Sequence, residues 1–366
     1  MIRKIKLSKR PLVCLTAYNK FSAQIIDNYC DLILVGDSLG MAYYGDSSTR
    51  SVKLEEIIRH AKSVRKGVKK SVLIVASLAY DGIETPENKV DMLLGGAGTY
   101  ICLSLRNFSS DYSIISVVGK DFKVKDLNLL ESCGVDISGI KIEQNNKTFY
   151  WSCIYTDNFK ERITTKTELN VMESFNPIIS KNKSKPDILL LGNLHPEIQI
   201  SAINQLNNRP SVIILDTMNY WIENFWDSVK EVISKVDIIS INDEESEMIT
   251  GYKDSNKAAK VLNSMGPRYV IIKKGKDGAE LFNYEKRYIA NAYKVDKVID
   301  PTGAGDCFIG GITGYLSQSS EVSFESIKSA IDYGTSLASF NVENMATKNL
   351  LNLSMSDIEK RINKLK

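Results

Sequence analysis

The segment IDPTGAGDCFIGG, residues 299–311, combines features that could perform group-transfer chemistry. A strand-like run ends at Asp300, a glycine-rich turn follows, and Asp306 opens an apolar, helix-like stretch. Backbone N–H groups at the start of a helix bind anions when little side-chain bulk surrounds them. A carboxylate at the same place can accept the proton of a hydroxyl nucleophile. Because phosphoryl transfer to an alcohol needs both parts, the segment predicts that reaction.

A structural interpretation of the same segment is a glycine-rich turn between a strand and a helix, with an Asp that caps the helix. Capping Asp residues are common, so a bare GxGD pattern would favour this interpretation. The full pattern DPTGAGDxFxGG favours the chemical interpretation, because it places the acid, the small residues and the apolar helix together.

The elements that must position this segment follow from the hydrophobic pattern. Short β-branched runs alternate with amphipathic stretches, which predicts parallel strands connected by helices. At the N-terminus we expect strands at 13–18 and 31–37 and helices at 20–29 and 54–66. Residues 140–165 are rich in aromatic residues and Thr, which predicts a hairpin or small sheet. The remaining strand-like runs are VLIVASLAY, DILLLGN, SVIILDT, VDIISIN and YVIIKKG, and the final third is predicted to be helical.

The composition excludes several classes of function. The chain has 43% hydrophobic and 25% charged residues and a net charge of +3, which are values of an ordinary soluble protein without a general affinity for nucleic acid. No apolar run approaches the roughly 20 residues of a membrane span, and the start does not resemble a secretory signal. The six cysteines form no CxxC pair, which argues against zinc and for reduced thiols. We therefore expect a cytoplasmic protein with neither a membrane nor a nucleic acid as partner.

The complete motif resembles the C-terminal signature of the ribokinase-like, PfkB-type sugar and nucleoside kinases. The resemblance runs from about residue 71 to the C-terminus and implies a doubly wound, mostly parallel α/β fold with a small β lid at about 140–165. It implies ATP and Mg²⁺ as cofactors, a sugar or nucleoside as the small-molecule acceptor, and a possible homodimer, since the family's lid can be a dimer contact. In that family the Asp matching Asp306 is the catalytic base. The positions matching the anion hole and its flank are Thr302, Gly303, Ala304 and Gly305.

The segment LGGAGTY, residues 94–100, resembles the family's N-terminal Gly-Gly segment. There the glycines matching Gly95 and Gly96 let the backbone approach the substrate. Asp81 matches the acid that binds substrate hydroxyls. Taken singly, the two glycines indicate a turn, and Asp81 could equally start a turn.

Two further segments resemble the nucleotide side of the family. Asn242 and Glu245 match the NxxE motif, which organises magnesium and phosphates largely through water, so Glu245 is a candidate metal organiser. Lys274 and Gly275 match ATP-binding positions, with Gly275 near the adenosine end. An exposed acidic helix start would produce NxxE by chance. No GxxxxGK[ST] is present, so the sequence is not that of a P-loop kinase.

The first 75 or so residues resemble the start of a different family, ketopantoate hydroxymethyltransferase, a magnesium-dependent (β/α)8 barrel. In that family the Asp matching Asp37 is a metal ligand and Ser38 helps to hold the oxo acid. Ser77 stands where the second metal-binding Asp belongs, and the strands that carry the later catalytic residues are missing. Two βα units and one strand cannot close an eight-stranded barrel, and one carboxylate would bind Mg²⁺ weakly.

We therefore expect a βαβα fragment of TIM-barrel type at residues 1–70, with Asp37 as a vestigial metal ligand, and a kinase domain at residues 71–366. Two alternatives to the kinase remain open. One is 3-methyl-2-oxobutanoate hydroxymethyltransferase activity from the N-terminal segment, and the other is a non-catalytic binding protein on a kinase scaffold. The acceptor is also open, because ribose, fructose-like sugars, nucleosides and polyols all fit the motif.

Overall fold

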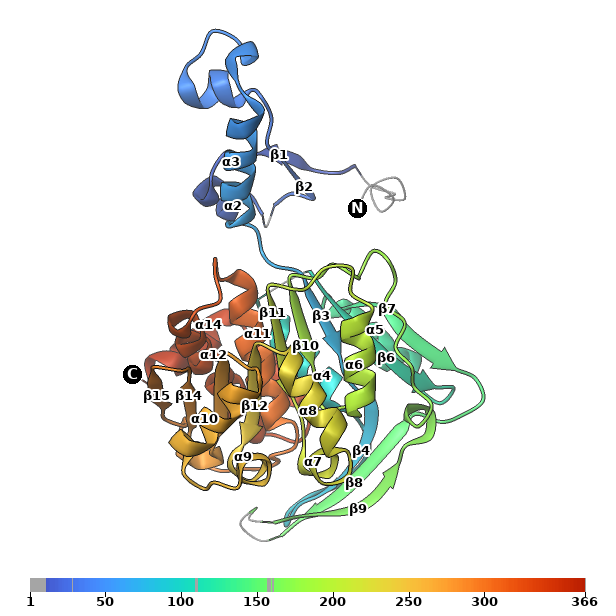
Figure 1. The fold of residues 1–366 in the computed structure, drawn as a ribbon. Coiled ribbons are helices and arrows are strands. Elements are labelled where there is room, and N and C mark those ends of the chain that lie inside the picture. The colour runs from blue at the N-terminus through green and yellow to red at the C-terminus, as the bar shows by residue number, and fades with distance from the viewer. Residues whose placement is uncertain (1–10, 28, 109–110, 157–158, 160, 366) are drawn as a thin grey trace. The chain divides into compact units, whose positions relative to one another are not determined.

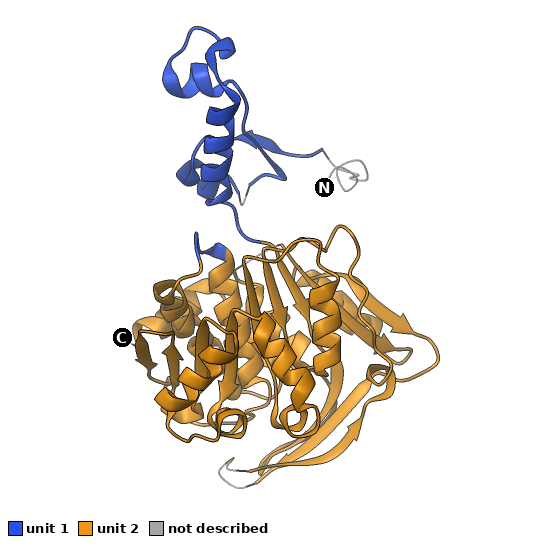
Figure 2. Cartoon of the chain, viewed as in Figure 1, with its two compact units in different colours: residues 1–70, 318–321 blue, residues 71–317, 322–366 orange. Residues whose placement is uncertain are grey.

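The computed structural model describes residues 11–27, 29–108, 111–156, 159 and 161–365, and it forms two compact units (Figures 1 and 2). One unit lies within residues 1–70 and 318–321, and the other within residues 71–317 and 322–366. The basic segment at residues 1–10, interpreted above as no secretory signal, lies outside the described residues.

The first unit has the predicted βαβα order, but its strands are shorter than expected. Its main elements are β1 (Cys14–Thr16), α2 (Lys20–Ile26), β2 (Leu32–Leu34) and α3 (Leu54–Arg65), with short helical turns at Gly40–Tyr44 and Thr49–Ser51. The two strands pair in parallel, with Cys14 opposite Leu32. The buried apolar cluster of this unit consists of Ala17, Ala23 and Val64.

The second unit is built on a nine-stranded sheet with the order β15-β14-β13-β12-β11-β10-β3-β6-β7. All neighbours from β13 to β7 are parallel, and β14 and β15 pair antiparallel at one edge. This arrangement confirms the predicted doubly wound, mostly parallel fold. The strands are β3 (Val72–Val75), β6 (Tyr112–Gly119), β7 (Asp136–Glu143), β10 (Ile188–Leu191), β11 (Val212–Asp216), β12 (Ile238–Asn242), β13 (Tyr269–Lys273), β14 (Ala279–Phe282) and β15 (Arg287–Ala290).

Helices cover both faces of this sheet because successive strand residues point to opposite sides. Ile188 and Leu190 belong to one core, and Leu189 and Leu191 belong to the other. The first core contains residues of α4 (Ala97–Leu105), α5 (Val124–Ser132), α11 (Ala304–Gln318) and α12 (Phe324–Val342). The second contains residues of α6 (Pro196–Asn204), α8 (Trp226–Lys235) and α10 (Ser255–Met265). The remaining helices are α7 (Asn219–Asn224), α9 (Asp243–Thr250), α13 (Lys348–Asn352) and α14 (Met355–Asn363).

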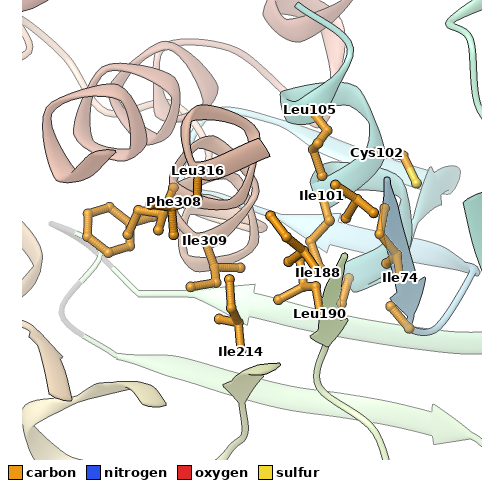
Figure 3. Close-up of a cluster of buried hydrophobic side chains, with 14 of the residues drawn as sticks. Ile74, Ile101, Cys102, Leu105, Ile188, Leu190, Ile214, Phe308, Ile309 and Leu316 are labelled. Atoms are coloured by element: carbon orange, nitrogen blue, oxygen red, sulfur yellow. The ribbon is translucent and has the colours of Figure 1, made fainter. Parts of the chain in front are cut away.

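The first core anchors the helix that begins with the glycine-rich signature. Figure 3 shows Ile309 of α11 beside the strand residues Ile188 and Ile214, with Ile101 of α4 on the other side of the cluster. Ile101, Ile188, Ile214 and Ile309 are completely buried. Each such side chain contributes about 1.5–3 kcal/mol by leaving water, so the start of α11 is fixed relative to the strand ends. Within the described residues, no helix is both long and apolar enough to cross a membrane.

A second, four-stranded sheet with the order β5-β4-β8-β9 forms the lid. Its strands are β4 (Ala79–Glu84), β5 (Lys89–Gly95), β8 (Phe149–Tyr155) and β9 (Arg162–Glu168). The lid therefore differs from the predicted range 140–165. Residues 140–143 belong to β7 of the main sheet, and residues 79–95 supply half of the lid.

The run VLIVASLAY, predicted as one strand, is divided between the two sheets. Its first half is β3 of the main sheet, and its second half enters β4 of the lid. Ser77, at the break, bonds the start of α4: Ala97 N–H donates to its hydroxyl at 3.3 Å, and Gly98 N–H donates to its carbonyl at 2.8 Å. The break thus supplies acceptors that the first turn of α4 needs.

Candidate active site

The candidate site lies where three parallel strands end. Neighbouring strands β11, β12 and β13 end at Asp216, Asn242 and Lys273, and Asn242 lies opposite Lys273 in the sheet register. The carboxyl ends of parallel strands therefore place these three polar side chains at one edge of the sheet. Ligands of open α/β sheets bind at this edge.

The glycine-rich segment forms the first turn of α11 at this edge. Gly303 has a left-handed backbone, with φ +76°, and α11 begins at Ala304. A Cβ at Gly303 would lie 2.4 Å from the ring of Tyr100, so a larger residue cannot fit. The N–H groups of Gly305 and Asp306 fall in the first turn, where a helix leaves backbone donors without partners inside the helix. The turn can therefore bind an anion.

Asp306 is the carboxylate of this turn. Burial, together with the charges of Asp216 and Asp81, raises its pKa to about 8, although Lys273 and Arg162 act in the opposite direction. A carboxylate with a pKa near neutrality is a stronger base than an ordinary exposed Asp and still ionises in a physiological pH range. The geometry is thus compatible with the predicted role of a general base.

The three residues predicted to bind the acceptor come together around Asp81 of the lid strand β4. Gly96 N–H donates to Asp81 Oδ2 at 3.4 Å. A Cβ on Gly95 would lie only 1.9 Å from the same oxygen, so glycine makes room for the carboxylate. Gly96 has φ +80°. Burial raises the pKa of Asp81 to about 7. Hydroxyl groups of a bound ligand could donate hydrogen bonds to this carboxylate and so offset the cost of burying it.

Thr302 is held by three contacts. Its N–H donates to Asp300 Oδ1 at 2.9 Å, and Asn341 Nδ2 donates to its carbonyl at 2.7 Å. Its hydroxyl bonds the hydroxyl of Tyr155, on lid strand β8, at 3.0 Å. Asp300 also accepts from Ala346 N–H at 2.9 Å and is completely buried. The first Asp of the motif therefore fixes the loop, and the lid is bonded directly to it.

Asn242 and Glu245 form a capping box at the start of α9. Glu245 N–H donates to Asn242 Oδ1 at 2.7 Å, and Asn242 N–H donates to Glu245 Oε2 at 2.8 Å. Burial raises the pKa of Glu245 to about 7, while Lys273 lowers it and Asp216 raises it. Asn242 and Glu245 thus act as a helix start, as the structural interpretation of NxxE requires. The Glu245 carboxylate also interacts with the charges of Lys273 and Asp216.

The sequence prediction assigned Lys274 to the nucleotide, but the ammonium at the strand ends is that of Lys273. Lys273 Nζ lies 2.8 Å from Asp216 Oδ1. The side chain of Lys274 instead pairs with Glu280 of β14, which also binds Arg287. Neither Asp216 nor Lys273 was predicted. A signal existed, because each is the charged residue that ends an apolar strand, SVIILD and YVIIK.

Gly275 begins the short turn Gly275–Asp277 after β13 and has φ +53°. A Cβ built there would meet no atom within 4 Å, so the backbone faces open space. This leaves the strand end accessible to a flat group such as a nucleotide base, in line with the predicted position of Gly275.

The residues present fit magnesium that is held mainly through phosphate oxygens and water. Over the described ranges, no three His, Cys, Asp or Glu side chains gather closely enough to hold a metal by themselves. Mg²⁺ usually keeps several waters and binds one or two carboxylates plus substrate phosphates. Glu245, whose carboxylate interacts with the charges of Lys273 and Asp216, suits that mode.

Asp37, the predicted vestigial metal ligand, lies in the first unit and is exposed. Its neighbour Ser38 bonds the hydroxyl of Tyr18 at 2.7 Å. Since the described residues contain no cluster of three potential ligands, Asp37 has no complete metal site around it.

Two family models match the chain, and their matches overlap over residues 69–92. The model of the pfkB family carbohydrate kinases matches residues 69–352, and that of ketopantoate hydroxymethyltransferase matches residues 1–92. Cytidine kinase of Thermococcus kodakarensis is 26% identical over 250 residues, covering 67% of this chain and 88% of that enzyme. The 3-methyl-2-oxobutanoate hydroxymethyltransferase of Pelagibacter ubique is 56% identical over 70 residues, which are 19% of this chain and 27% of that enzyme.

Solved structures of the ribokinase family share the fold. The nucleoside kinase of Methanocaldococcus jannaschii superposes with a TM-score of 0.65 at 19% identity, over 81% of this chain and 99% of that one. A ribokinase II of E. coli in complex with ATP and Mg²⁺ gives a TM-score of 0.68 at 17% identity, over 81% and 99% of the two chains. Together with the family model, which spans more than half of the sequence, these matches show that the chain belongs to the pfkB family of carbohydrate kinases.

Proposed function

We propose that the protein transfers the γ-phosphoryl group of ATP to a hydroxyl group of a sugar or nucleoside. One observation carries the proposal: the first turn of α11 combines an anion-binding backbone with the carboxylate of Asp306. Gly303 keeps that turn free of side chains, and the Tyr100 ring beneath it makes glycine necessary. The family membership supports the same reaction class.

In the proposed reaction, Asp306 accepts the proton of the acceptor hydroxyl. The acceptor oxygen forms a bond to the γ-phosphorus while the bond from that phosphorus to the ADP oxygen breaks, and ADP leaves with the electron pair. Backbone N–H groups of residues 303–306 stabilise the charge on the transferring group. Asp81, set in place by Gly96, binds hydroxyls of the acceptor. Mg²⁺, near Glu245, would neutralise charge on the phosphates.

The lid has a direct part in this proposal. Tyr155 of β8 bonds Thr302 of the signature, and Asp81 of β4 belongs to the same small sheet. Closing this sheet over the acceptor would exclude water from the transferring phosphoryl group. Two strands of one sheet thus supply the acceptor acid and the contact to the anion hole.

The experiment that tests the proposal measures ADP release from ATP and Mg²⁺ with a panel of acceptors. Nucleosides come first, since similar proteins are named cytidine kinase and nucleoside kinase, and ribose, fructose-like sugars and polyols follow. We expect turnover with one class and a loss of at least about 10²-fold in Asp306→Asn, as for removal of a general base. Full turnover in Asp306→Asn would contradict the assignment of the base.

A second candidate function, 3-methyl-2-oxobutanoate hydroxymethyltransferase activity, is favoured by the 56% identity of the N-terminal 70 residues to such an enzyme. The matched part is 27% of that enzyme, and the described residues of the first unit form a single parallel pair of strands, β1 and β2. This function predicts Mg²⁺-dependent turnover of the 2-oxo acid without ATP that Asp37→Asn abolishes. Absence of such turnover in the folded, ATP-competent protein would exclude it.

A further inference from the structure

We propose that Lys273 binds the transferring phosphoryl group as a further catalytic residue and that Asp216 holds its ammonium group in place. The inference rests on the proposed kinase function and deepens it. It concerns a buried ion pair at the carboxyl ends of β11 and β13, two strands that both flank β12.

The ion pair is well defined. Lys273 Nζ lies 2.8 Å from Asp216 Oδ1, and the side chains are 19% and 8% exposed. A lysine has three donors, so one bond to Asp216 leaves donors that can bind a further acceptor. Both residues are the last residues of strands, so their backbone positions are fixed by the sheet and not by a loop.

The ammonium group lies beside the anion-binding turn. A Cβ built on Gly305 would be 3.4 Å from Lys273 Nζ. Glycine therefore keeps the space between the ammonium and the backbone of α11 open. An anion bound at the first turn of α11 would face both the backbone donors and this lysine, which is the arrangement that phosphoryl transfer uses to spread charge.

The charges around Lys273 keep it protonated. Burial alone lowers the pKa of Lys273, but Asp216 and Glu245 raise it above its ordinary value, and Asp306 acts in the same direction. One ammonium thus stands among three carboxylates from three elements. A lysine serves as a point charge for phosphate in many sites, and this one is permanently charged at neutral pH.

A purely structural ion pair would be the alternative. Buried ion pairs contribute little net stability, because desolvation offsets much of their attraction. The pair Lys183–Asp136, elsewhere in the second unit, is a matched example, since Lys183 is 9% exposed and its partner is on the edge strand β7. The two ion pairs differ in their location. Of the two lysines, Lys273 is the one whose ammonium group lies next to a signature glycine, Gly305.

The first test measures binding rather than turnover. Calorimetry would give the Kd of ADP and of the non-hydrolysable analogue β,γ-imido-ATP, with Mg²⁺, for the full chain, Lys273→Met, Asp216→Asn and the control Lys183→Met. Because Lys273 faces the γ-phosphate, Lys273→Met should weaken analogue binding about tenfold and leave ADP binding within about twofold, since one charge-assisted hydrogen bond changes affinity by about that factor. Lys183→Met should keep the ratio of the two affinities.

The second test measures catalysis with the acceptor that the parent protein uses. We expect kcat to fall about 10²-fold in Lys273→Met, as for loss of one electrostatic donor in a buried site, and to recover in part in Lys273→Arg. Asp216→Asn keeps the ammonium but not its anchor, so its kcat should lie between those of the parent and Lys273→Met.

The pH profile reports the electrostatic effect of Lys273 on the base, whereas the binding ratio separates the proposed role from a structural one. The charged groups that act on Asp306 are Asp216 of β11, Asp81 of β4, Lys273 of β13 and Arg162 of β9. Lys273 lowers the pKa of Asp306, so its removal should move the acid limb of kcat/KM to higher pH.

Each outcome decides the matter. If Lys273→Met folds and keeps both the parent preference for the analogue and the parent kcat, the inference is wrong while the kinase assignment stands. If Lys273→Met does not fold, Asp216→Asn and Lys273→Arg decide by the same binding ratio, and parent values in both would overturn the inference. A parent protein that binds neither nucleotide contradicts the proposed function and this inference together.

Discussion

At the residue scale, the second unit contains several buried acids at the candidate site that are hard to ionise. Burial raises the pKa of Asp306 to about 8 and the pKa values of Asp81 and Glu245 to about 7. These side chains come from different elements, so the fold, not local sequence, brings them together. Charges that are costly to bury without a partner indicate a site where a ligand supplies the missing partners.

The first prediction concerns the pH dependence of turnover. Asp306 must be deprotonated to act as a base, and a pKa of about 8 means that the active form increases with pH up to that value. We expect kcat/KM to rise roughly tenfold between pH 6 and pH 7 and to level off above about pH 8. Steady-state rates at constant ionic strength measure this. A flat profile from pH 6 to pH 9 with rate-limiting chemistry would contradict the base assignment.

The second prediction concerns Asp81 and stability. A buried acid with a raised pKa stabilises the fold while it is protonated, so its contribution is present below the unfolded pKa of about 4 and lost as pH rises through about 7. Asp81→Asn should therefore stabilise the protein at pH 8, by about 4 kcal/mol at most, and change little at pH 4. Urea unfolding at both pH values measures this. Equal effects at the two pH values would refute the buried charge.

The same substitution has an opposite effect on function. Asp81→Asn should raise the KM of the acceptor, because the neutral amide loses the stronger, charge-assisted bonds to hydroxyl groups. ATP affinity should stay within about twofold if Asp81 serves the acceptor alone. If Asp81→Asn gains stability and loses acceptor binding, Asp81 lowers the stability of the fold and serves function instead.

The third prediction concerns Gly303. Gly303→Ala places a methyl group 2.4 Å from the Tyr100 ring in a backbone with φ +76°, so either the ring or the turn must move. We expect kcat to fall at least about tenfold, because a displacement of about 1 Å in a catalytic turn costs that much or more. The matched control is Gly251→Ala, which has φ +75° and no neighbour within 4 Å, and which should change stability alone.

The contiguous residues of the candidate site could be proposed from the sequence, and the dispersed ones could not. Gly303, Gly305 and Asp306 were singled out because one turn needs all of them in a fixed order. Asp216 and Lys273 were not found, since a charged residue after an apolar strand is common and gains meaning only from the pairing of β11 and β13 with β12. The sequence alone does not show that Lys273 pairs with Asp216 at the strand ends while the adjacent Lys274 pairs with Glu280.

At the element scale, the lid is tied to the signature by one hydrogen bond between hydroxyl groups. Tyr155 ends β8, and its hydroxyl lies 3.0 Å from that of Thr302. A net hydrogen bond stabilises by about 0.5–1.5 kcal/mol, which corresponds to a factor of two to ten in an equilibrium. The bond is thus strong enough to bias the position of the lid and weak enough to open during turnover.

The fourth prediction follows from this contact. Tyr155→Phe should increase hydrogen exchange of the β8 and β9 amides and raise the KM of the acceptor by about two- to tenfold, because the lid loses its bond to the signature. Tyr150→Phe is the matched control, since Tyr150 lies on the same strand and its hydroxyl bonds Asp91 at 2.8 Å. Equal effects of both substitutions on KM would show that the lid responds to strand stability and not to the Thr302 contact.

The lid also shows why element boundaries were harder to predict than elements. The apolar runs at 188–191, 212–216, 238–242 and 269–273 are buried strands of one parallel sheet, and their pattern predicted them. The break inside VLIVASLAY depends on Ser77, whose carbonyl and hydroxyl bond the start of α4, a contact twenty residues away. The residue types at 140–143 do not distinguish a strand of the lid from a strand of the main sheet. These residues pair with β6 of the main sheet.

At the scale of the whole molecule, the two units differ in how much core they contain. The second unit has two extensive apolar clusters on the faces of its sheet. Among its described residues, the first unit buries four apolar side chains, Ala17, Ala23, Leu39 and Val64. It exposes ten large ones, which are Val13, Phe21, Ile25, Tyr29, Leu34, Met41, Tyr43, Tyr44, Leu54 and Ile58. A segment of this length with so small a core is marginally stable. The sequence predicted the division from two unrelated resemblances, but only the fold shows this contrast.

The last prediction concerns removal of the first unit. Every residue assigned above to phosphoryl transfer lies within residues 71–317, so a chain of residues 71–366 contains the anion-binding turn, the base and the lid. We expect its kcat and its KM for ATP to stay within about twofold of the parent values, because none of the named interactions is removed. It should also aggregate less on heating, since ten exposed apolar side chains are gone.

The measurement compares initial rates and light scattering during a thermal ramp for the two chains. Asp306→Asn in the shortened chain is the control, and it should lower turnover at least about 10²-fold, as expected for the full chain. A shortened chain that folds, shown by its thermal transition, but loses turnover would mean that the first unit contributes to catalysis. In that case the catalytic unit would be the whole chain, because the interactions of residues 71–366 would form the site without being sufficient to operate it.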